Sequence, residues 1–327
     1  MSWLTIPDEK HAQAIFDIVG YSEERAPGRS VRTPGVNRTN KEEPEKLDSD
    51  KASLYRSGAG SAIFLASDCE AITFASKELA RGLSAPDEEH YEDLTRLARW
   101  LWEHRGWLTE NKVDEETVAA YRAGERLQLC MHHDSDWASS KVDRRSTTGM
   151  RATIGGFRVS HSSGTQPGLP ALSSGEAELR SMSRACCSSI YIQKVAAELL
   201  ISVDITLMGD STAAMANAAK LGPGRIRHLE AAQMAVKEAV RRKLVRLRKV
   251  DGSLNTSDLH TKHVDGKTLD GFLPVIGFRK ATEEDLAYSH CDQFKLNELS
   301  SLQRLPQRAP SEKVLGQAVR VVEHDVE

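Results

Sequence analysis

The chain has 327 residues, of which 39% are hydrophobic and 28% are charged, and its formal net charge is −3. This length allows two modest domains with their connections. No stretch approaches the roughly 18 uninterrupted apolar residues of a membrane span, and the opening MSWLTIPDEKHAQ lacks the charged and apolar regions of a signal peptide. We therefore expect an intracellular protein of the cytoplasm or nucleus that has no membrane partner.

The charge is distributed unevenly along the chain. Residues 125–270 contain 21 Lys and Arg against 15 Asp and Glu, a net of +6, whereas the remainder contains 23 against 32, a net of −9. A positive field of this size favours the approach of a polyanion but is too mild to establish nucleic-acid binding by itself.

The first third of the sequence predicts helices. In residues 1–21, Ala12, Ile15 and Phe16 belong to an apolar stripe that is typical of a short helical segment. Residues 22–50 are charged and contain Pro and Gly without periodicity, which indicates a linker. Residues 51–110 predict a small helical module with helices over roughly 51–66, 69–84 and 87–105.

The pattern changes to short strands from Leu127. RLQLCMHHD, MRATIGGF and RVSHSS predict three consecutive strands, with Gly155–Gly156 as the tight turn between the second and the third. A long helix is then expected to begin at Ser173, whose spacing to Glu176 fits a capping box.

The later elements complete one sheet. VDITLMGD predicts a fourth strand that ends at Asp210, two helices follow, LVRLRKV predicts a fifth strand, and Asp258 is expected to open a last short helix. We predict an α/β domain over residues 122–270, with a mixed five-stranded sheet (three antiparallel strands, then two more) flanked by helices. Residues 271–327 predict a loosely ordered tail.

Four acidic residues end a predicted strand or begin a predicted helix in this domain: Asp134, Glu178, Asp210 and Asp258. Carboxylates that converge at one edge of a sheet repel one another unless cations neutralise them. Hard oxygen ligands suit Mg²⁺ or Mn²⁺, and two such ions can activate a water and stabilise the leaving oxygen of a phosphodiester. The acids therefore form a candidate two-metal site.

Four sequence strings occur in order within about 130 residues: LCMHHDSDWASSKVDRRSTTG, LSSGEAEL, GDSTAAMANA and SDLHTK. Together they resemble the ribonuclease H domain of copia-type retrotransposon Pol polyproteins. Upstream, LYRSGAGSAIFLAS and ITFASKELARGLSAPDEEHYEDLTRLARWLWEHRG resemble the thumb and connection helices that follow the reverse transcriptase palm in that family.

The resemblance implies a function. Asp134, Glu178, Asp210 and Asp258 match the family's four metal-binding catalytic carboxylates, so the implied activity is Mg²⁺- or Mn²⁺-dependent cleavage of the RNA strand of an RNA–DNA hybrid. The remainder of a Pol polyprotein would be a partner. The sequence contains no Tyr-x-Asp-Asp motif of a polymerase palm, so we expect no DNA synthesis from this chain.

Other polar residues near these motifs have competing interpretations. Arg144, Arg145, Ser146 and Thr147 could contact phosphates of the hybrid or form a solvated turn. Asp136 and Glu176 are expected to support the site as capping or neighbouring residues rather than to bind metal. His228 matches a family histidine and is a candidate auxiliary residue.

Two alternatives remain open. The sequence has His161 and Met234 where the family has Trp and His, and the palm motif is missing, so the chain could be a degenerate remnant that binds nucleic acid or a partner without cutting. A resolvase or integrase core of the same fold is a third possibility, which the fourth carboxylate and the DRRSTTG string disfavour.

Overall fold

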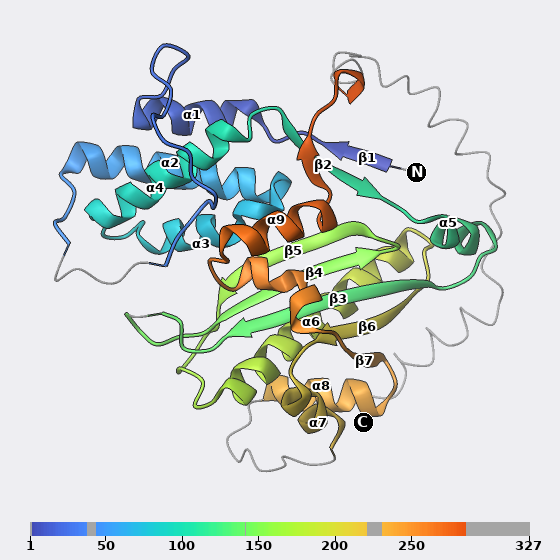
Figure 1. The fold of residues 1–327 in the computed structure, drawn as a ribbon. Helices are drawn as coiled ribbons and strands as arrows, with labels where there is room; N and C mark the ends of the chain where they lie inside the picture. Colours follow the sequence, from blue (N-terminus) through green and yellow to red (C-terminus); the bar gives the residue numbers. More distant parts are fainter. Residues whose placement is uncertain (1, 38–43, 141, 221–230, 286–327) are drawn as a thin grey trace. The chain divides into compact units, whose positions relative to one another are not determined.

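The computed structural model of this protein describes residues 2–37, 44–140, 142–220 and 231–285. Its central feature is a five-stranded sheet with the strand order β5-β4-β3-β6-β7 (Figure 1). The strands are β3 (Leu127–Asp136), β4 (Thr147–Ile154), β5 (Phe157–Thr165), β6 (Val203–Gly209) and β7 (Val245–Lys249). The first three strands are antiparallel, and β6 and β7 continue the sheet in parallel with β3. The predicted mixed sheet is confirmed.

The turn between β4 and β5 is set by its two glycines. Gly155 and Gly156 have φ of 56° and 85°, in the left-handed region that costs a glycine little. Two residues with positive φ form a hairpin turn whose twist matches that of the strands it joins. The turn therefore sets the register next to it, Ile154 with Phe157 and Thr153 with Arg158, and an irregularity shifts the register from Ala152 onward.

Three helices pack against the sheet or against one another: α6 (Ser174–Glu198), α7 (Thr212–Ala219) and α8 (Ala231–Arg241). The long helix α6 begins as predicted, because the Ser173 hydroxyl accepts the backbone N–H of Glu176 at 3.2 Å. The capping box is only half formed, since the Glu176 carboxylate accepts the N–H of Leu172 instead of that of Ser173. Buried side chains between α6 and the strands make the sheet core, which includes Leu129, Met131, Leu179, Met182, Ile205 and Leu207.

A second core is built mainly from helices. These are α1 (Glu9–Val19), α2 (Ser49–Asp68), the 3-10 helix η1 (Glu70–Ile72), α3 (Thr73–Arg81) and α4 (Glu88–Glu103). The helical module predicted upstream of the sheet thus has its own helical core, with Ile15, Tyr55, Leu65, Ile72, Leu97 and Trp100 fully or almost fully buried. A short helix, α5 (Glu115–Arg122), lies between this module and β3.

The chain returns to the helical core after the sheet. Beyond β7 come the 3-10 helices η2 (Gly252–Leu254) and η3 (Thr256–His260), then α9 (Gly266–Val275) and β8 (Phe278–Lys280). Five side chains of α9, its C-cap and β8 are buried in the helical core: Leu269, Phe272, Leu273, Ile276 and Phe278. The chain therefore remains regularly folded beyond residue 271, where we had predicted the start of a loose tail.

A small second sheet ties both parts of the helical core together. Its middle strand β2 (Trp107–Lys112) pairs antiparallel with β1 (Ser2–Thr5) on one side and with β8 on the other. The strand β1 corrects the prediction of helix from the first residue, because the apolar stripe that predicted the helix starts only at Ala12, within α1.

The described residues up to Lys280 form one compact unit, and beyond them the structure describes only residues 281–285. Within the described residues, no helix combines the length and apolar character that a membrane crossing requires. Four cysteines, Cys69, Cys130, Cys186 and Cys187, are free thiols.

Candidate active site

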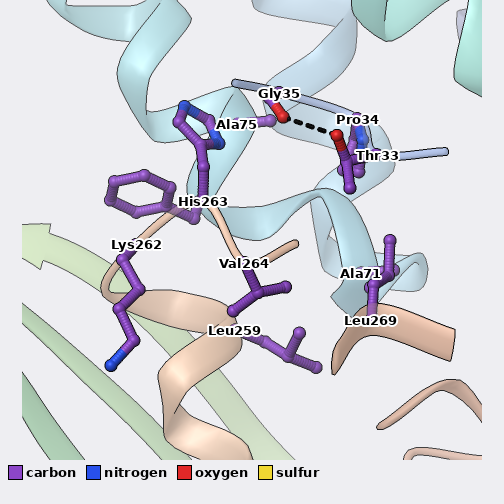
Figure 2. Close-up of a pocket in the computed structure, with 11 residues that line it drawn as sticks. Thr33, Pro34, Gly35, Ala71, Ala75, Leu259, Lys262, His263, Val264 and Leu269 are labelled. Atoms are coloured by element: carbon purple, nitrogen blue, oxygen red, sulfur yellow. Dashed lines mark hydrogen bonds between the residues drawn. The ribbon is translucent and has the colours of Figure 1, made fainter. Parts of the chain in front are cut away.

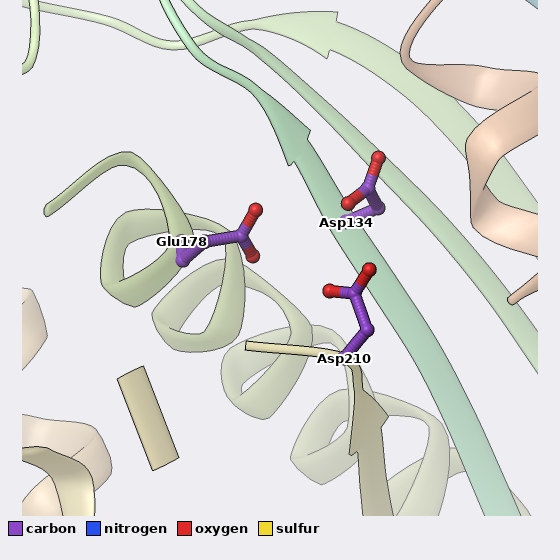
Figure 3. Close-up of side chains that lie close together, drawn as sticks. All are labelled: Asp134, Glu178 and Asp210. Atoms are coloured by element: carbon purple, nitrogen blue, oxygen red, sulfur yellow. The ribbon is translucent and has the colours of Figure 1, made fainter. Parts of the chain in front are cut away.

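Three of the four predicted acids converge at one end of the sheet (Figure 3). One carboxylate oxygen from each of Asp134, Glu178 and Asp210 lies within 4.8 Å of the others. Asp134 belongs to β3, Glu178 to the first turns of α6, and Asp210 directly follows β6. The strands β3 and β6 are parallel and pair as far as His132 and Met208. Asp134 and Asp210 each lie two residues beyond this pair. The convergence is therefore a result of strand register.

Asp134 is held by two hydroxyl groups, one bonded to its backbone oxygen and one to its carboxylate. The Ser181 hydroxyl on α6 donates to the backbone oxygen of Asp134 at 2.8 Å. From the other side, the Thr261 hydroxyl donates to Asp134 Oδ2 at 2.6 Å. One oxygen of this carboxylate is thus oriented by the protein before any ligand arrives.

A buried glutamine joins the elements that carry the site. Gln166, 3% exposed, donates through Nε2 to Ser135 Oγ, to Thr148 Oγ1 and to the backbone oxygen of Ala177, at 3.2, 3.1 and 2.9 Å. These three partners lie on β3, β4 and α6. Gln166 therefore holds the N-terminal turns of α6, where Glu178 lies, against the sheet.

The fourth acid, Asp258, lies beside this group on η3. It is in the middle of the 3-10 helix rather than at its start, because Asn255 provides the N-cap. Its carboxylate interacts with Asp134, and Lys262 Nζ approaches its Oδ2 to 3.0 Å. The structure thus brings Asp258 next to Asp134, with a lysine on its other side.

The charges in this group are unfavourable to one another. Burial, together with the carboxylates of Asp134 and Asp210, raises the pKa of Glu178 to about 9. Burial and the Asp134 carboxylate also raise the pKa of Asp258 to about 7, and they raise that of Asp210. The physical cause is that like charges in a desolvated site favour the neutral forms. A cation would reverse this preference.

The donor set fits hard divalent cations. Its atoms are all carboxylate oxygens, which Mg²⁺ and Mn²⁺ prefer. Glu178 Oε2 is also buried without a hydrogen-bond partner, although buried polar atoms are normally satisfied. Asp134, Glu178 and Asp210 could hold such an ion directly, and Asp258 lies where it could complete the group.

The residues predicted to contact phosphates differ in exposure. Arg144 and Arg145 are exposed on the loop between β3 and β4. Ser146 and Thr147 are each 1% exposed and have partners inside the protein: Ser146 Oγ accepts the N–H of Ala138, and Thr147 Oγ1 accepts a hydrogen bond from Lys77 Nζ. Of the four predicted phosphate contacts, only the two arginines face solvent. His228 lies outside the described residues.

The supporting acids act within the protein. Glu176 is 1% exposed; its carboxylate accepts the N–H of Leu172 at 3.0 Å and pairs with Arg180 at 2.8 Å. Asp136 is half-buried, and burial raises its pKa although a hydrogen bond with Ser139 opposes the shift. Neither residue belongs to the group that could hold a metal ion in the described residues.

Thr261 and Lys262 are functional candidates that the sequence reasoning did not assign. Both lie in the SDLHTK string, at the third and fourth positions after Asp258. Side chains with this spacing face one another on a helical turn. The spacing was therefore an available signal for the pair of Lys262 with Asp258, whereas Asp134, the partner of Thr261, lies 127 positions earlier and was not visible in any local pattern.

No family model matches this chain. It is 32% identical over 148 residues to the retrovirus-related Pol polyprotein from transposon RE1 of Arabidopsis thaliana, which is 44% of this chain and 9% of the relative. It is 29% identical over 152 residues to the corresponding polyprotein from transposon RE2 of the same plant, 46% of this chain and 10% of the relative. Its homologues are retrovirus-related Pol polyproteins. The chain spans about a tenth of their length.

Among solved structures, LC11-RNase H1, isolated from compost by a metagenomic approach, aligns with 13% identity and a TM-score of 0.32. The alignment covers 45% of this chain and 98% of that protein. Independently of this likeness, the strand order and the helices that pack against the sheet confirm the predicted mixed five-stranded sheet flanked by helices.

Proposed function

We propose that this chain is a metal-dependent endonuclease of the ribonuclease H type, which cleaves the RNA strand of RNA–DNA hybrids as part of a copia-type retrotransposon Pol polyprotein. The observation that carries the proposal is the approach of one oxygen each from Asp134, Glu178 and Asp210 to within 4.8 Å. The homology to Pol polyproteins supports the polyprotein context. The four free thiols suit a reducing compartment, the cytoplasm or the nucleus.

The described residues would have different roles in such a site. Asp134, Glu178 and Asp210 would hold Mg²⁺ or Mn²⁺, with Asp258 at the side of the group. Two divalent ions there would supply water activation and charge stabilisation at the leaving oxygen. Thr261 keeps one oxygen of Asp134 oriented, and Lys262 balances Asp258.

The substrate is a polyanion, and the charge distribution favours its approach. The sheet region carries the net positive charge, although the acids lie within it. We propose that Arg144 and Arg145, exposed on the loop beyond β3, contact phosphates of the hybrid, because guanidinium groups bind phosphates with two parallel hydrogen bonds.

A cleavage assay with a matched pair of aspartate variants tests the proposal. The purified chain should cut the labelled RNA strand of a hybrid when Mg²⁺ or Mn²⁺ is added. Asp134→Asn should reduce the rate by more than about 100-fold, since changes even in residues that only support metal ligands cost roughly 10–100-fold. Asp204→Asn should leave it unchanged, because Asp204 on β6 pairs with Arg126 and Arg246 outside the acidic group.

Each other outcome of this assay would contradict the proposal in a different way. Tight hybrid binding without cleavage under any divalent ion would favour the degenerate remnant. Preferential cutting of duplex DNA would favour a resolvase or integrase core. Equal activity of Asp134→Asn and the unsubstituted chain would refute the site.

A further inference from the structure

The segment that carries Asp258 lies between the two cores of the molecule. Its residues alternate in what they contact: Asp258 and Thr261 interact with Asp134, whereas Leu259 is buried in the helical core. His263 also faces the helical side, with its ring 4.7 Å from that of Phe74 on α3. One short segment therefore serves the acidic group and the helical core together.

The segment also meets the helical module around a small pocket. Figure 2 shows His263, Val264 and Leu259 lining this pocket together with Ala71 and Ala75 of the module and the stretch Thr33–Gly35. A Cβ atom on Gly35 would lie 2.1 Å from the His263 ring, so only glycine leaves room for that ring at this position. The region between residues 22 and 50, predicted as a linker, thus includes a stretch that packs on the segment after η3.

A buried carboxylate connects η1 of the helical module to η3. Glu70 is 0% exposed, and its Oε1 lies 2.8 Å from Arg151 Nε on β4 and 3.3 Å from His260 Nε2 on η3. Its Oε2 lies 3.6 Å from Arg158 on β5. Burial alone would raise the pKa of Glu70, but Arg151 and His260 outweigh it and hold the pKa well below its usual range. Glu70 is therefore a buried charge at the junction of three elements.

The sheet also fixes η3. A Cβ on Gly149 of β4 would lie 2.6 Å from the backbone oxygen of Ser257 and 2.8 Å from His260 Cβ. Asn255 Nδ2 also donates to the backbone oxygen of His133 at 3.1 Å. The position of η3 is thus set by the sheet and by Glu70 together, with Asp258 between two anchored residues, Asn255 and His260.

We propose that Glu70 is a positioning residue for the nuclease site: through His260 it holds η3 so that Asp258 faces Asp134, and the helical module thereby completes a metal site whose other ligands come from the sheet domain. This inference rests on the proposed function for the role of Asp258. It predicts that the sheet domain, residues 122–270, separated from the module, would lack an ordered fourth carboxylate.

The decisive experiment compares Glu70→Gln and His260→Gln with Glu110→Gln in the full chain. Glu110 pairs with Arg279 at 2.8 Å and ties β8 to β2 without touching η3, so it is a matched control. In metal-free protein, hydrogen exchange of the amides of residues 256–261 should accelerate at least about tenfold in the first two variants, while β3 and β6 remain protected. Their Mn²⁺ affinity should fall roughly 10–100-fold, and kcat for hybrid cleavage should fall with KM unchanged.

His260→Gln keeps the inference testable if Glu70→Gln fails to fold, because it leaves Glu70 with both arginines. A second test uses Asp258→Asn: combined with His260→Gln it should weaken Mn²⁺ binding no more than Asp258→Asn does alone, since both changes act through one carboxylate. Additive losses of Mn²⁺ affinity in the double variant would overturn the inference. Hydrogen exchange of η3 and Mn²⁺ affinity equal to those of Glu110→Gln would overturn it as well. The exchange measurement needs neither metal nor substrate, so faster exchange with no cleavage by any variant would reject the nuclease function while keeping the anchor.

Discussion

Two of the buried glutamates, Glu70 and Glu178, lie in opposite electrostatic surroundings. Glu70 is fully buried between the helical module and the sheet, with Arg151, Arg158 and His260 around it, and its pKa is held low. Glu178 is 9% exposed at the end of the sheet, and burial together with other carboxylates raises its pKa to about 9.

We propose that this difference separates a structural charge from a metal ligand. The Glu70 site contains its own cations, so its charge is balanced when the chain folds, and its role is to fix neighbouring elements. The Glu178 site has too few, so its balance must come from outside. A buried acid with arginine partners therefore indicates architecture, and a buried acid among other acids indicates a binding site.

The largest effect is expected from removing a cationic partner of Glu70. Arg151→Met should lower the free energy of unfolding by about 3–5 kcal/mol, because it leaves a buried charge without its nearest partner. Arg246→Met, which breaks an exposed pair with Asp204, should cost less than about 1 kcal/mol. Urea unfolding of both variants measures this, and equal losses would mean that the Glu70 cluster is no more structural than a surface pair.

The next effect tests the packing of η3 on β4, because η3 carries both His260 of the Glu70 cluster and Asp258 of the acidic group. Gly149→Ala should cost about 1–3 kcal/mol through overpacking and should also weaken Mn²⁺ binding, because the new methyl group pushes η3 and Asp258 away from β4. Gly60→Ala, on α2 with nothing within 4 Å of its would-be Cβ, should instead stabilise by about 0.5–1 kcal/mol. Thermal unfolding and Mn²⁺ titration give both numbers. Unchanged metal affinity in Gly149→Ala would show that η3 can shift without consequence.

The last effect concerns the acidic group around Glu178. A folded-state pKa near 9 against an ordinary value of 4.5 means that the metal-free protein loses stability progressively as pH rises through this window. In the presence of a chelator, Glu178→Gln should therefore melt above the unsubstituted chain near pH 8, by roughly 2–4 °C for each kcal/mol that the charge costs, and the gap should close toward pH 5. Saturating Mn²⁺ should reverse the order, since only the intact site gains from binding. A pH-independent gap would contradict the assigned cause.

Local patterns in the sequence were enough for the sheet domain. Alternating apolar residues in β3, the turn glycines Gly155 and Gly156, and the Ser173 cap each act over a few residues, and each was readable. The convergence of Asp134 and Asp210 followed from two parallel strands that end at the same step of the ladder. Acids placed at strand ends could therefore be assigned before their distances were known.

Long-range pairings were not readable in the same way. The strand β1 exists because Ser2–Thr5 find β2 more than a hundred residues later, and no local signal in SWLT specifies that partner. The same holds for Glu70 and His260, which meet across 190 positions. By contrast, α9 had a readable signal: Leu269, Phe272, Leu273 and Ile276 are spaced as one helical face, although Pro274 within it argues against a helix.

The pairing of β2 with β8 has a consequence for how the chain folds during synthesis. The helical core needs Phe278 and the four apolar side chains of residues 269–276, which emerge from the ribosome only after the whole sheet domain. Contacts so distant in sequence form slowly because a long loop must close first. The sheet can pack on α6 as soon as β7 has emerged from the ribosome. The helices made first must wait for residues 269–278, which complete their core. Of the two cores, the one whose helices are made first is therefore the one completed last.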